Sequence, residues 1–233
     1  QISLVWGVVT ALGLIASQES LAQDPHAASA EVEQALHLTP DIGNGARVYQ
    51  ICSVCHRPEG WGSLDGVYPQ IAGQHAGVII KQLADIRARN RDNPIRSPFA
   101  VPGTLGGAQE IADVAAYIEA LPMNPRNGVG PGTDLEYGKQ LYVTNCAECH
   151  GEQGEGNPAA LVSRIQGQNF LYMVRQFEWI RDGKRRNSNP EMVEQIKNFT
   201  DKDMQMVINY VSLQPVPKDQ MAESADWQNP DYK

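Results

Sequence analysis

The chain carries the stretch Cys52-Ser53-Val54-Cys55-His56 and, 94 residues later, a second copy of its pattern, Cys146-Ala147-Glu148-Cys149-His150. These two stretches contain all four cysteines of the 233 residues. Cys-x-x-Cys-His is the attachment motif of c-type haem: two thiols one helical turn apart form thioethers to the porphyrin vinyl groups, and the adjacent histidine binds the iron. The motifs therefore predict two covalently bound haem c groups, held by Cys52, Cys55, Cys146 and Cys149, with His56 and His150 as iron ligands.

Three other uses of paired cysteines fit this pattern less well. A structural zinc site gathers four ligands, typically from cysteine pairs roughly 12–20 residues apart, and does not require a histidine after each pair. A thioredoxin-like redox pair belongs in a βαβ unit, and this sequence shows no alternating strand pattern. Disulfides between neighbouring cysteines would leave both histidines without a role.

The repetition extends well beyond the two motifs. The offset of 94 also relates Gly73-Gln74-His75 to Gly167-Gln168-Asn169, Gln82-Leu83 to Gln176-Phe177, and Ile86-Arg87 to Ile180-Arg181. At an offset of 93, Tyr117 falls on Tyr210. Similarity at a fixed spacing indicates a tandem duplication of one module.

Each copy is predicted to be all-α. A first helix runs into the cysteine motif, at about residues 45–55 and 136–149, and apolar residues at helical spacing predict a second helix over 78–86 and 170–180. A third helix closes each copy, at 111–118 and 204–211, and Thr200-Asp201-Lys202-Asp203 is typical of an N-terminal cap for the last one.

The composition divides the chain into six segments. Residues 1–22 form a predicted secretory signal peptide, in which an apolar run from Ile2 to Ala16 leads to a small-x-small cleavage site after Ala22. Residues 23–40 are predicted to be a polar N-terminal arm, 41–124 the first haem-binding domain, 125–133 a linker, 134–215 the second haem-binding domain, and 216–233 a polar C-terminal tail.

The apolar run has about 15 positions, whereas roughly 20 are needed to span a bilayer. An uncleaved segment that tethers the protein to the membrane is the alternative to cleavage. With either outcome, the folded part is expected to lie in the periplasm.

Charge and size restrict the function further. The formal net charge is −8, which argues against nucleic-acid binding and suits attraction to a basic partner surface. Hydrophobic residues make up 42% of the chain, so it is not a disordered protein. A module of about 80 residues buries only about 60% of its surface, so a large apolar group is expected to complete each core.

With these features the chain resembles the dihaem cytochromes c4. The resemblance rests on the two motifs, on Pro69-Gln70-Ile71-Ala72-Gly73-Gln74-His75 and on the Ile111–Tyr117 helix, and it covers residues 41–214. It implies two class I cytochrome c domains whose His/Met-ligated haems face each other across the domain interface. It also implies periplasmic electron transfer towards terminal oxidases or reductases. In this family the carbonyl at the Pro69 position orients the proximal histidine, and the second copy has Ser163 there.

The sixth iron ligand differs between the copies. Met192, 42 residues after His150, lies where a class I module provides its distal methionine. The same offset of 94 leads from Met192 to Pro98, and no methionine lies between His56 and Met123. Four alternatives stay open for the first haem: ligation by His75, by Met123, by His26 or His37 of the arm in the same or a neighbouring chain, or an open iron.

Cations follow the second helix in both copies, namely Arg87, Arg89, Arg91 and Arg96, and Arg181, Lys184, Arg185 and Arg186. They could complement the helix dipole, or bind haem propionates or a partner.

The favoured function is a periplasmic dihaem electron carrier that exchanges electrons with an oxidase, reductase or dehydrogenase. One alternative is a haem enzyme or enzyme subunit in which the first haem is the catalytic iron and the second relays electrons. Another is a subunit of a haem chain, self-associating through an arm histidine that binds the next subunit's iron.

Overall fold

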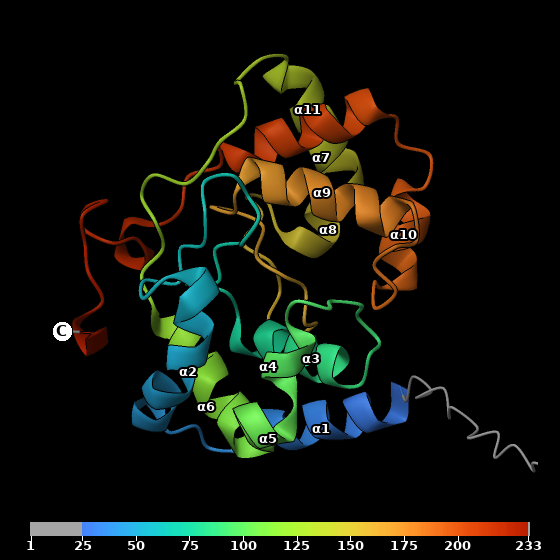
Figure 1. The fold of residues 1–233 in the computed structure, drawn as a ribbon. Helices are drawn as coiled ribbons and strands as arrows, with labels where there is room; N and C mark the ends of the chain where they lie inside the picture. The colour runs from blue at the N-terminus through green and yellow to red at the C-terminus, as the bar shows by residue number, and fades with distance from the viewer. Residues whose placement is uncertain (1–24, 233) are drawn as a thin grey trace, which may run out of the picture.

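The computed structural model describes residues 25–232, which form helices, loops and two isolated β-bridges. The helices group into two modules, one containing α1 to α6 and the other α7 to α11 (Figure 1). The chain crosses between them through the predicted linker, and each module carries one cysteine motif.

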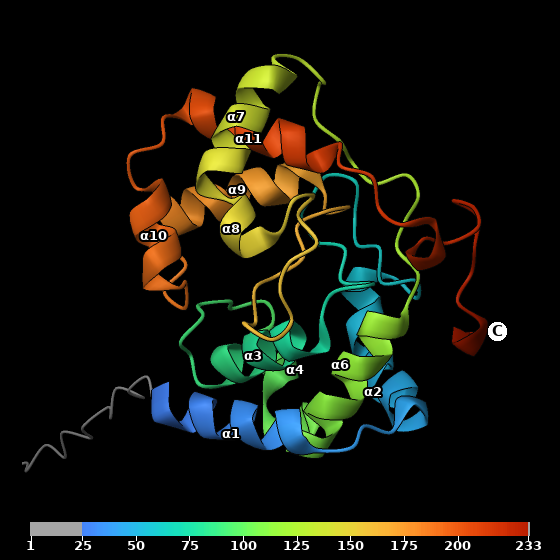
Figure 2. The ribbon, with the colours of Figure 1, turned by 180° about the vertical axis from the view of Figure 1, so that it is seen from behind.

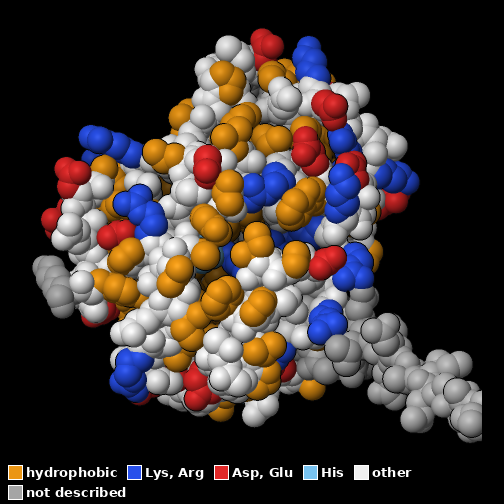
Figure 3. Space-filling view, viewed as in Figure 1, with side chains coloured by type: hydrophobic (Ala, Val, Ile, Leu, Met, Phe, Trp, Pro, Cys, Tyr) orange, Lys and Arg blue, Asp and Glu red, His pale blue; other side chains and the backbone are white. Residues whose placement is uncertain are grey.

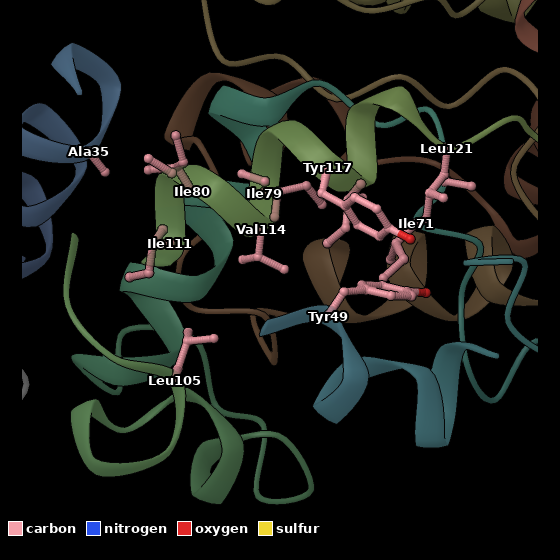
Figure 4. Close-up of a cluster of buried hydrophobic side chains, with 14 of the residues drawn as sticks. Ala35, Tyr49, Ile71, Ile79, Ile80, Leu105, Ile111, Val114, Tyr117 and Leu121 are labelled. Atoms are coloured by element: carbon pink, nitrogen blue, oxygen red, sulfur yellow. The ribbon is translucent and has the colours of Figure 1, made fainter. Parts of the chain in front are cut away.

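Module one is built on a close helix crossing. Helix α2 (Ile42–His56) packs against α6 (Ala108–Ala120), and α3 (Ala76–Arg87) packs against α6 as well. Gly45 makes the approach possible, because a Cβ there would lie 2.2 Å from the carbonyl oxygen of Asp113. One turn further along, the rings of Tyr49 and Tyr117 are in contact, tilted by 46° with centroids 5.3 Å apart (Figure 4).

Module two repeats this crossing with α7 (Leu135–Asn145) and α11 (Asp201–Ser212), and α9 (Phe170–Arg181) packs against α11. A Cβ on Gly138 would lie 2.2 Å from the carbonyl oxygen of Met206, and Tyr142 lies 5.6 Å from Tyr210. The predicted cap of α11 is confirmed: the Asp203 amide donates to Thr200 Oγ1 at 3.1 Å, and the Thr200 amide donates back to Asp203 Oδ2 at 3.0 Å.

The helix that enters the cysteine motif is continuous in module one and interrupted in module two. There, α7 ends at Asn145 and a short α8 (Ala147–His150) follows, with Cys146 between them at φ −124°. Tyr142 lies four residues before Cys146, whereas Tyr49 lies three residues before Cys52. The extra residue explains why the repeat offset changes from 93 to 94, and the helix breaks because it has to absorb that residue.

The second loop of each module also differs. Module one has two single-turn helices, α4 (Ser97–Ala100) and α5 (Pro102–Leu105), between α3 and α6. Module two has one helix there, α10 (Pro190–Ile196). In both cases a proline occupies the first turn, where its missing amide hydrogen costs no hydrogen bond.

The prediction of a polar arm over 23–40 is wrong for its described part. Pro25–His37 form α1, which packs against α3 and α6 with Ala28 and Ala35 buried. The apolar stripe of this helix consists of Ala28, of Val32 four residues later and of Ala35 seven residues later. The predicted signal peptide, residues 1–22, lies outside the described residues.

The predicted polar tail, residues 216–233, packs on the rest of the protein over its described part. The tail returns from module two and lies against module one (Figure 2), carrying the short helices η1 (Lys218–Gln220) and η2 (Pro230–Tyr232). Asn229 is buried and its amide donates to the Pro58 carbonyl oxygen at 2.7 Å and to the Tyr117 hydroxyl at 2.8 Å. The ring of Trp227 lies 5.9 Å from that of Trp61. Within residues 25–232, no helix is long and apolar enough to span a membrane.

Candidate haem sites

The two motif histidines are held in the same way. His56 ends α2 and its Nδ1 lies 2.9 Å from the carbonyl oxygen of Pro69, while His150 ends α8 and its Nδ1 lies 3.0 Å from the carbonyl oxygen of Ser163. The contact that the resemblance implies is thus present in both modules, with serine in place of proline. A carbonyl that accepts from Nδ1–H fixes the tautomer and leaves Nε2 as the lone-pair donor for a metal.

Burial keeps both imidazoles in the ligating, neutral form. Desolvation, together with the nearby Arg96 guanidinium, lowers the pKa of His56 to about 3, against the opposite effect of the Pro69 carbonyl. Desolvation also lowers the pKa of His150 below its usual range. Since only the neutral ring has a free lone pair, both side chains are ready to bind iron near neutral pH.

The cysteines lie beside these histidines at the edges of the two cores. Cys52 packs against the core of module one and Cys146 against that of module two, and burial raises the pKa of Cys52 to about 11 and of Cys146 to about 12. Cys55 is half-buried and Cys149 is exposed. The two thiols of each motif thus lie at the edge of a core, where both can reach the same apolar group.

Between the modules lie two arginine side chains, of which Arg91 is buried and Arg185 is half-buried. Arg91 donates to Gln82 at 2.7 Å and to Gln176 at 3.1 Å, and Arg185, its counterpart 94 residues later, donates to Gln176 at 3.1 Å and to Gln82 at 3.2 Å. Desolvation lowers the pKa of Arg185 to about 10. Within the described part of the chain neither guanidinium forms an ion pair with a carboxylate. Buried cations call for anionic partners.

The same region fits the anionic edge of haem. Figure 3 shows lysine and arginine side chains at the centre of one face, among hydrophobic side chains. Haem propionates supply carboxylates, which guanidinium groups bind in a bidentate manner. The histidines and thiols present thus fit two covalent haems, and Arg91 and Arg185 are the residues that would hold propionates.

The two modules meet through reciprocal hydrogen bonds. The Gln70 amide donates to Gln168 Oε1 at 3.2 Å, and Gln168 Nε2 donates to the Gln70 carbonyl oxygen at 2.7 Å. At the equivalent positions, the Arg164 amide donates to Gln74 Oε1 at 3.0 Å and Gln74 Nε2 donates to the Arg164 carbonyl oxygen at 2.9 Å. The interface is therefore pseudo-twofold, and it joins the segments that carry the Pro69 and Ser163 carbonyls.

The predicted distal ligands are distributed unevenly. Met192 lies on the first turn of α10 and packs, half-buried, against the core of module two. His75 caps α3 at the module interface, where Nε2 lies 2.8 Å from the Glu155 carbonyl oxygen and Nδ1 lies 3.6 Å from Glu119 Oε1.

The remaining candidates also have other contacts. Met123 is buried at the interface and its sulfur lies 3.4 Å from Arg164 Nη1. His37 ends α1 with Nδ1 2.8 Å from the Glu33 carbonyl oxygen and is exposed. His26 belongs to α1, but its side chain lies outside the described residues.

The residue of module one that corresponds to Met192 was not found by the comparison at an offset of 94. Asn93-Pro94-Ile95-Arg96 corresponds to Asn189-Pro190-Glu191-Met192 at an offset of 96. The backbone agrees, because the Ser97 amide donates to the Asn93 carbonyl oxygen at 2.9 Å and the Val193 amide to that of Asn189 at 3.1 Å. Arg96, and not Pro98, therefore stands in the place of Met192, and its Nη2 contacts His56 Nε2.

Comparison with known proteins agrees with this geometry. The cytochrome c family matches residues 42–122 and again 135–214. Cytochrome c4 of Thiocapsa roseopersicina is 32% identical over 182 residues, which cover 74% of this chain and 91% of the relative. The chain belongs to the dihaem cytochrome c4 family.

Two further similarities are informative. A protein of Stutzerimonas stutzeri described as a thiosulfate dehydrogenase electron acceptor is 28% identical over 194 residues, covering 75% of this chain and 88% of that one. The structure of reduced recombinant cytochrome c4 from Pseudomonas stutzeri has the same fold, with a TM-score of 0.66 at 23% identity over 75% of this chain and 98% of that one.

These matches confirm several predictions from the sequence. The fold is all-α with two tandem class I cytochrome c domains, and the two motifs bind two covalent haem c groups. The chain is a cytochrome c4-like dihaem electron carrier.

Proposed function

We propose that this cytochrome c4 works in the periplasm and carries electrons from a dehydrogenase or reductase to a terminal acceptor such as an oxidase. Each bound haem supplies a one-electron ferric/ferrous couple. The chain's own residues hold the two groups next to each other, keep their surroundings dry and present a docking face.

The observation that carries this proposal is the paired interface. Gln70, Gln74, Arg164 and Gln168 lock the two segments that hold the proximal histidines, through four hydrogen bonds of 2.7–3.2 Å. Such a network restricts movement of one module against the other. A fixed separation between the two iron sites favours electron exchange within the chain.

Charge and similarity support the choice of partner. The net charge of −8 favours encounter with a basic protein surface. A relative that is described as an electron acceptor of thiosulfate dehydrogenase points to a sulfur-oxyanion dehydrogenase as the donor. The function needs no nucleic acid.

A stopped-flow experiment tests this function. The oxidised protein, produced in a host that matures c-type cytochromes, is mixed with reduced thiosulfate dehydrogenase, and haem reduction is followed by absorbance. We expect reduction of both haems, with a rate that falls as ionic strength rises. Reduction by dithionite together with no measurable reduction by the dehydrogenase would contradict the partner assignment.

The interface is tested in the same assay. Gln168→Ala removes the side chain that bonds Gln70 twice, so we expect slower electron equilibration between the haems. Gln214→Ala, which removes a side chain bonded only to the Tyr210 carbonyl oxygen of its own module, is the matched control and should equilibrate as the wild type does.

A second function is favoured by one observation, the replacement of the distal methionine by Arg96 in module one. In that case haem 1 binds an external molecule and haem 2, ligated by His150 and Met192, relays electrons. The haem-chain alternative, in which His37 or His26 binds the iron of a neighbouring chain, is supported only by the exposure of His37 at the end of α1.

A periplasmic location is compatible both with a free protein and with one tethered to the membrane. We propose cleavage after Ala22, with an uncleaved tether as the alternative, and the N-terminal sequence of the protein purified from membrane and soluble fractions distinguishes them.

A further inference from the structure

Module one has a hydrogen-bond donor, Arg96, at the position where module two has the thioether sulfur of Met192. Arg96 and Met192 occupy equivalent positions after an Asn-Pro turn whose backbone hydrogen bonds match in the two modules. Methionine offers a thioether sulfur that can ligate iron. Arginine has five N–H donors, no acceptor, and stays protonated in proteins, so it cannot ligate iron itself.

The Arg96 side chain is aimed at the proximal histidine. Its Nη2 contacts His56 Nε2, the atom that the Pro69 carbonyl leaves free for iron. Direct contact leaves no space for a metal atom between these nitrogens. Arg96 would therefore have to move outward to admit the iron, and it would then be the residue of the 93–100 loop that faces a ligand bound there.

The described candidates that the sequence offers in place of the methionine have other contacts. Both ring nitrogens of His75 face oxygen atoms at the module interface, and the Met123 sulfur lies against Arg164. His37 lies exposed at the end of α1, with its Nδ1 against the Glu33 carbonyl oxygen.

We propose that the distal face of haem 1 is a binding site for a small anion, which coordinates the ferric iron through its own lone pair and accepts hydrogen bonds from Arg96. The inference rests on the dihaem assignment and deepens the proposed function, because it names the class of molecule that haem 1 takes. Binding needs no electron transfer: the anion gives a lone pair to the iron and displaces a water molecule or fills a vacant position.

The preference for an anion follows from the charges around the site. Arg96 is half-buried, and Arg91, five residues earlier on the same segment, is a buried guanidinium. A positively charged, partly desolvated pocket favours anionic over neutral ligands. The planar guanidinium also matches anions that offer two acceptor atoms.

Azide is a suitable probe, and imidazole is its neutral counterpart. The ferric full-length protein is titrated with each, and haem absorbance together with electron paramagnetic resonance reports the spin state. We expect the free protein to contain one low-spin and one high-spin haem, and azide to convert only the latter, with one azide bound per chain.

Three variants separate the role of Arg96 from general effects. Arg96→Leu should weaken azide about tenfold or more, the effect of one charge-assisted hydrogen bond, and leave imidazole within about twofold. Arg96→Met should give two low-spin haems and abolish azide binding. Arg89→Leu removes an exposed cation from the same module and should leave both affinities within about twofold.

The wild-type titration decides the matter even if a variant fails to fold. Two low-spin haems that bind no azide would overturn the proposal while leaving the electron-carrier function intact. Equal weakening of azide and imidazole by Arg96→Leu would also overturn it, because the guanidinium would then have no specific role towards the anion. A protein without covalent haem would overturn both this proposal and the function on which it rests.

Discussion

Gly45 controls how closely α2 approaches α6, and the Gly45→Ala variant measures the value of that approach. The new Cβ would lie 2.2 Å from the Asp113 carbonyl oxygen and 2.8 Å from Tyr117 Cβ, whereas ordinary contacts begin at 3.4 Å. Because the first neighbour is backbone, the helices must separate by about 1 Å. Overpacking of this kind costs about 1–3 kcal/mol, and a weaker ring contact between Tyr49 and Tyr117 adds to it.

We therefore expect a loss of about 3 kcal/mol in the free energy of unfolding of module one, reduced by less than about 1 kcal/mol through the better helix propensity of alanine. Urea denaturation of the full chain, followed by circular dichroism and haem absorbance, measures it. Gly103→Ala is the matched control, since nothing lies within 4 Å of a Cβ there on α5. If both variants were as stable as the wild type, the helix crossing would not depend on a glycine.

Three other variants test separate parts of the account. Met192→Leu should open haem 2, so the reduced protein should bind one more carbon monoxide per chain than the wild type; unchanged binding would remove Met192 as the ligand. Asn229→Ala should lower the free energy of unfolding by about 1–3 kcal/mol, because it removes two hydrogen bonds from a buried side chain, those to the Pro58 carbonyl oxygen and to the Tyr117 hydroxyl; a change in urea midpoint below experimental error would show that these bonds of the tail do not stabilise module one. Burial alone would raise the pKa of Asp113, but hydrogen bonds from Asn44 and two other donors lower it. The ionised Asp113 therefore stabilises the folded state above the ordinary pKa of about 3.9, and this contribution is lost as pH falls through the lower folded-state value. Asp113→Asn should remove this part of the acid destabilisation, and an identical acid unfolding curve would contradict that.

The predictions that succeeded rest on local patterns. The cysteine motifs and the apolar spacing of the second and third helices need no long-range information, and the cap at Thr200 is decided within four residues. The Pro69 and Ser163 contacts follow from the resemblance, and a carbonyl serves in both because every residue has one.

The predictions that failed depend on packing at a distance. Helix α1 has few large apolar residues, so its sequence reads as polar although Ala28, Val32 and Ala35 form a stripe that α3 and α6 cover. The tail contacts module one through Trp227 on Trp61 and through Asn229 on the Pro58 carbonyl oxygen. No pattern within residues 216–233 predicts those contacts.

Arg96 could have been found from the sequence. An offset of 94 relates the two modules only where neither has extra residues. The distal loops differ in length, so subtracting 94 from Met192 gives Pro98, whereas the Asn-Pro turns align at an offset of 96. The repeated Asn-Pro turn before Arg96 and before Met192 was the available signal.

The central claim is that two haem groups are bonded to this chain through its two cysteine pairs. Intact-protein mass spectrometry under denaturing conditions, on protein made in a host that matures c-type cytochromes, tests it most directly. The account predicts a mass greater than that of the polypeptide by two haems, falling by one haem when Cys52 and Cys55 are both replaced by alanine. A wild-type mass equal to that of the polypeptide alone would contradict it.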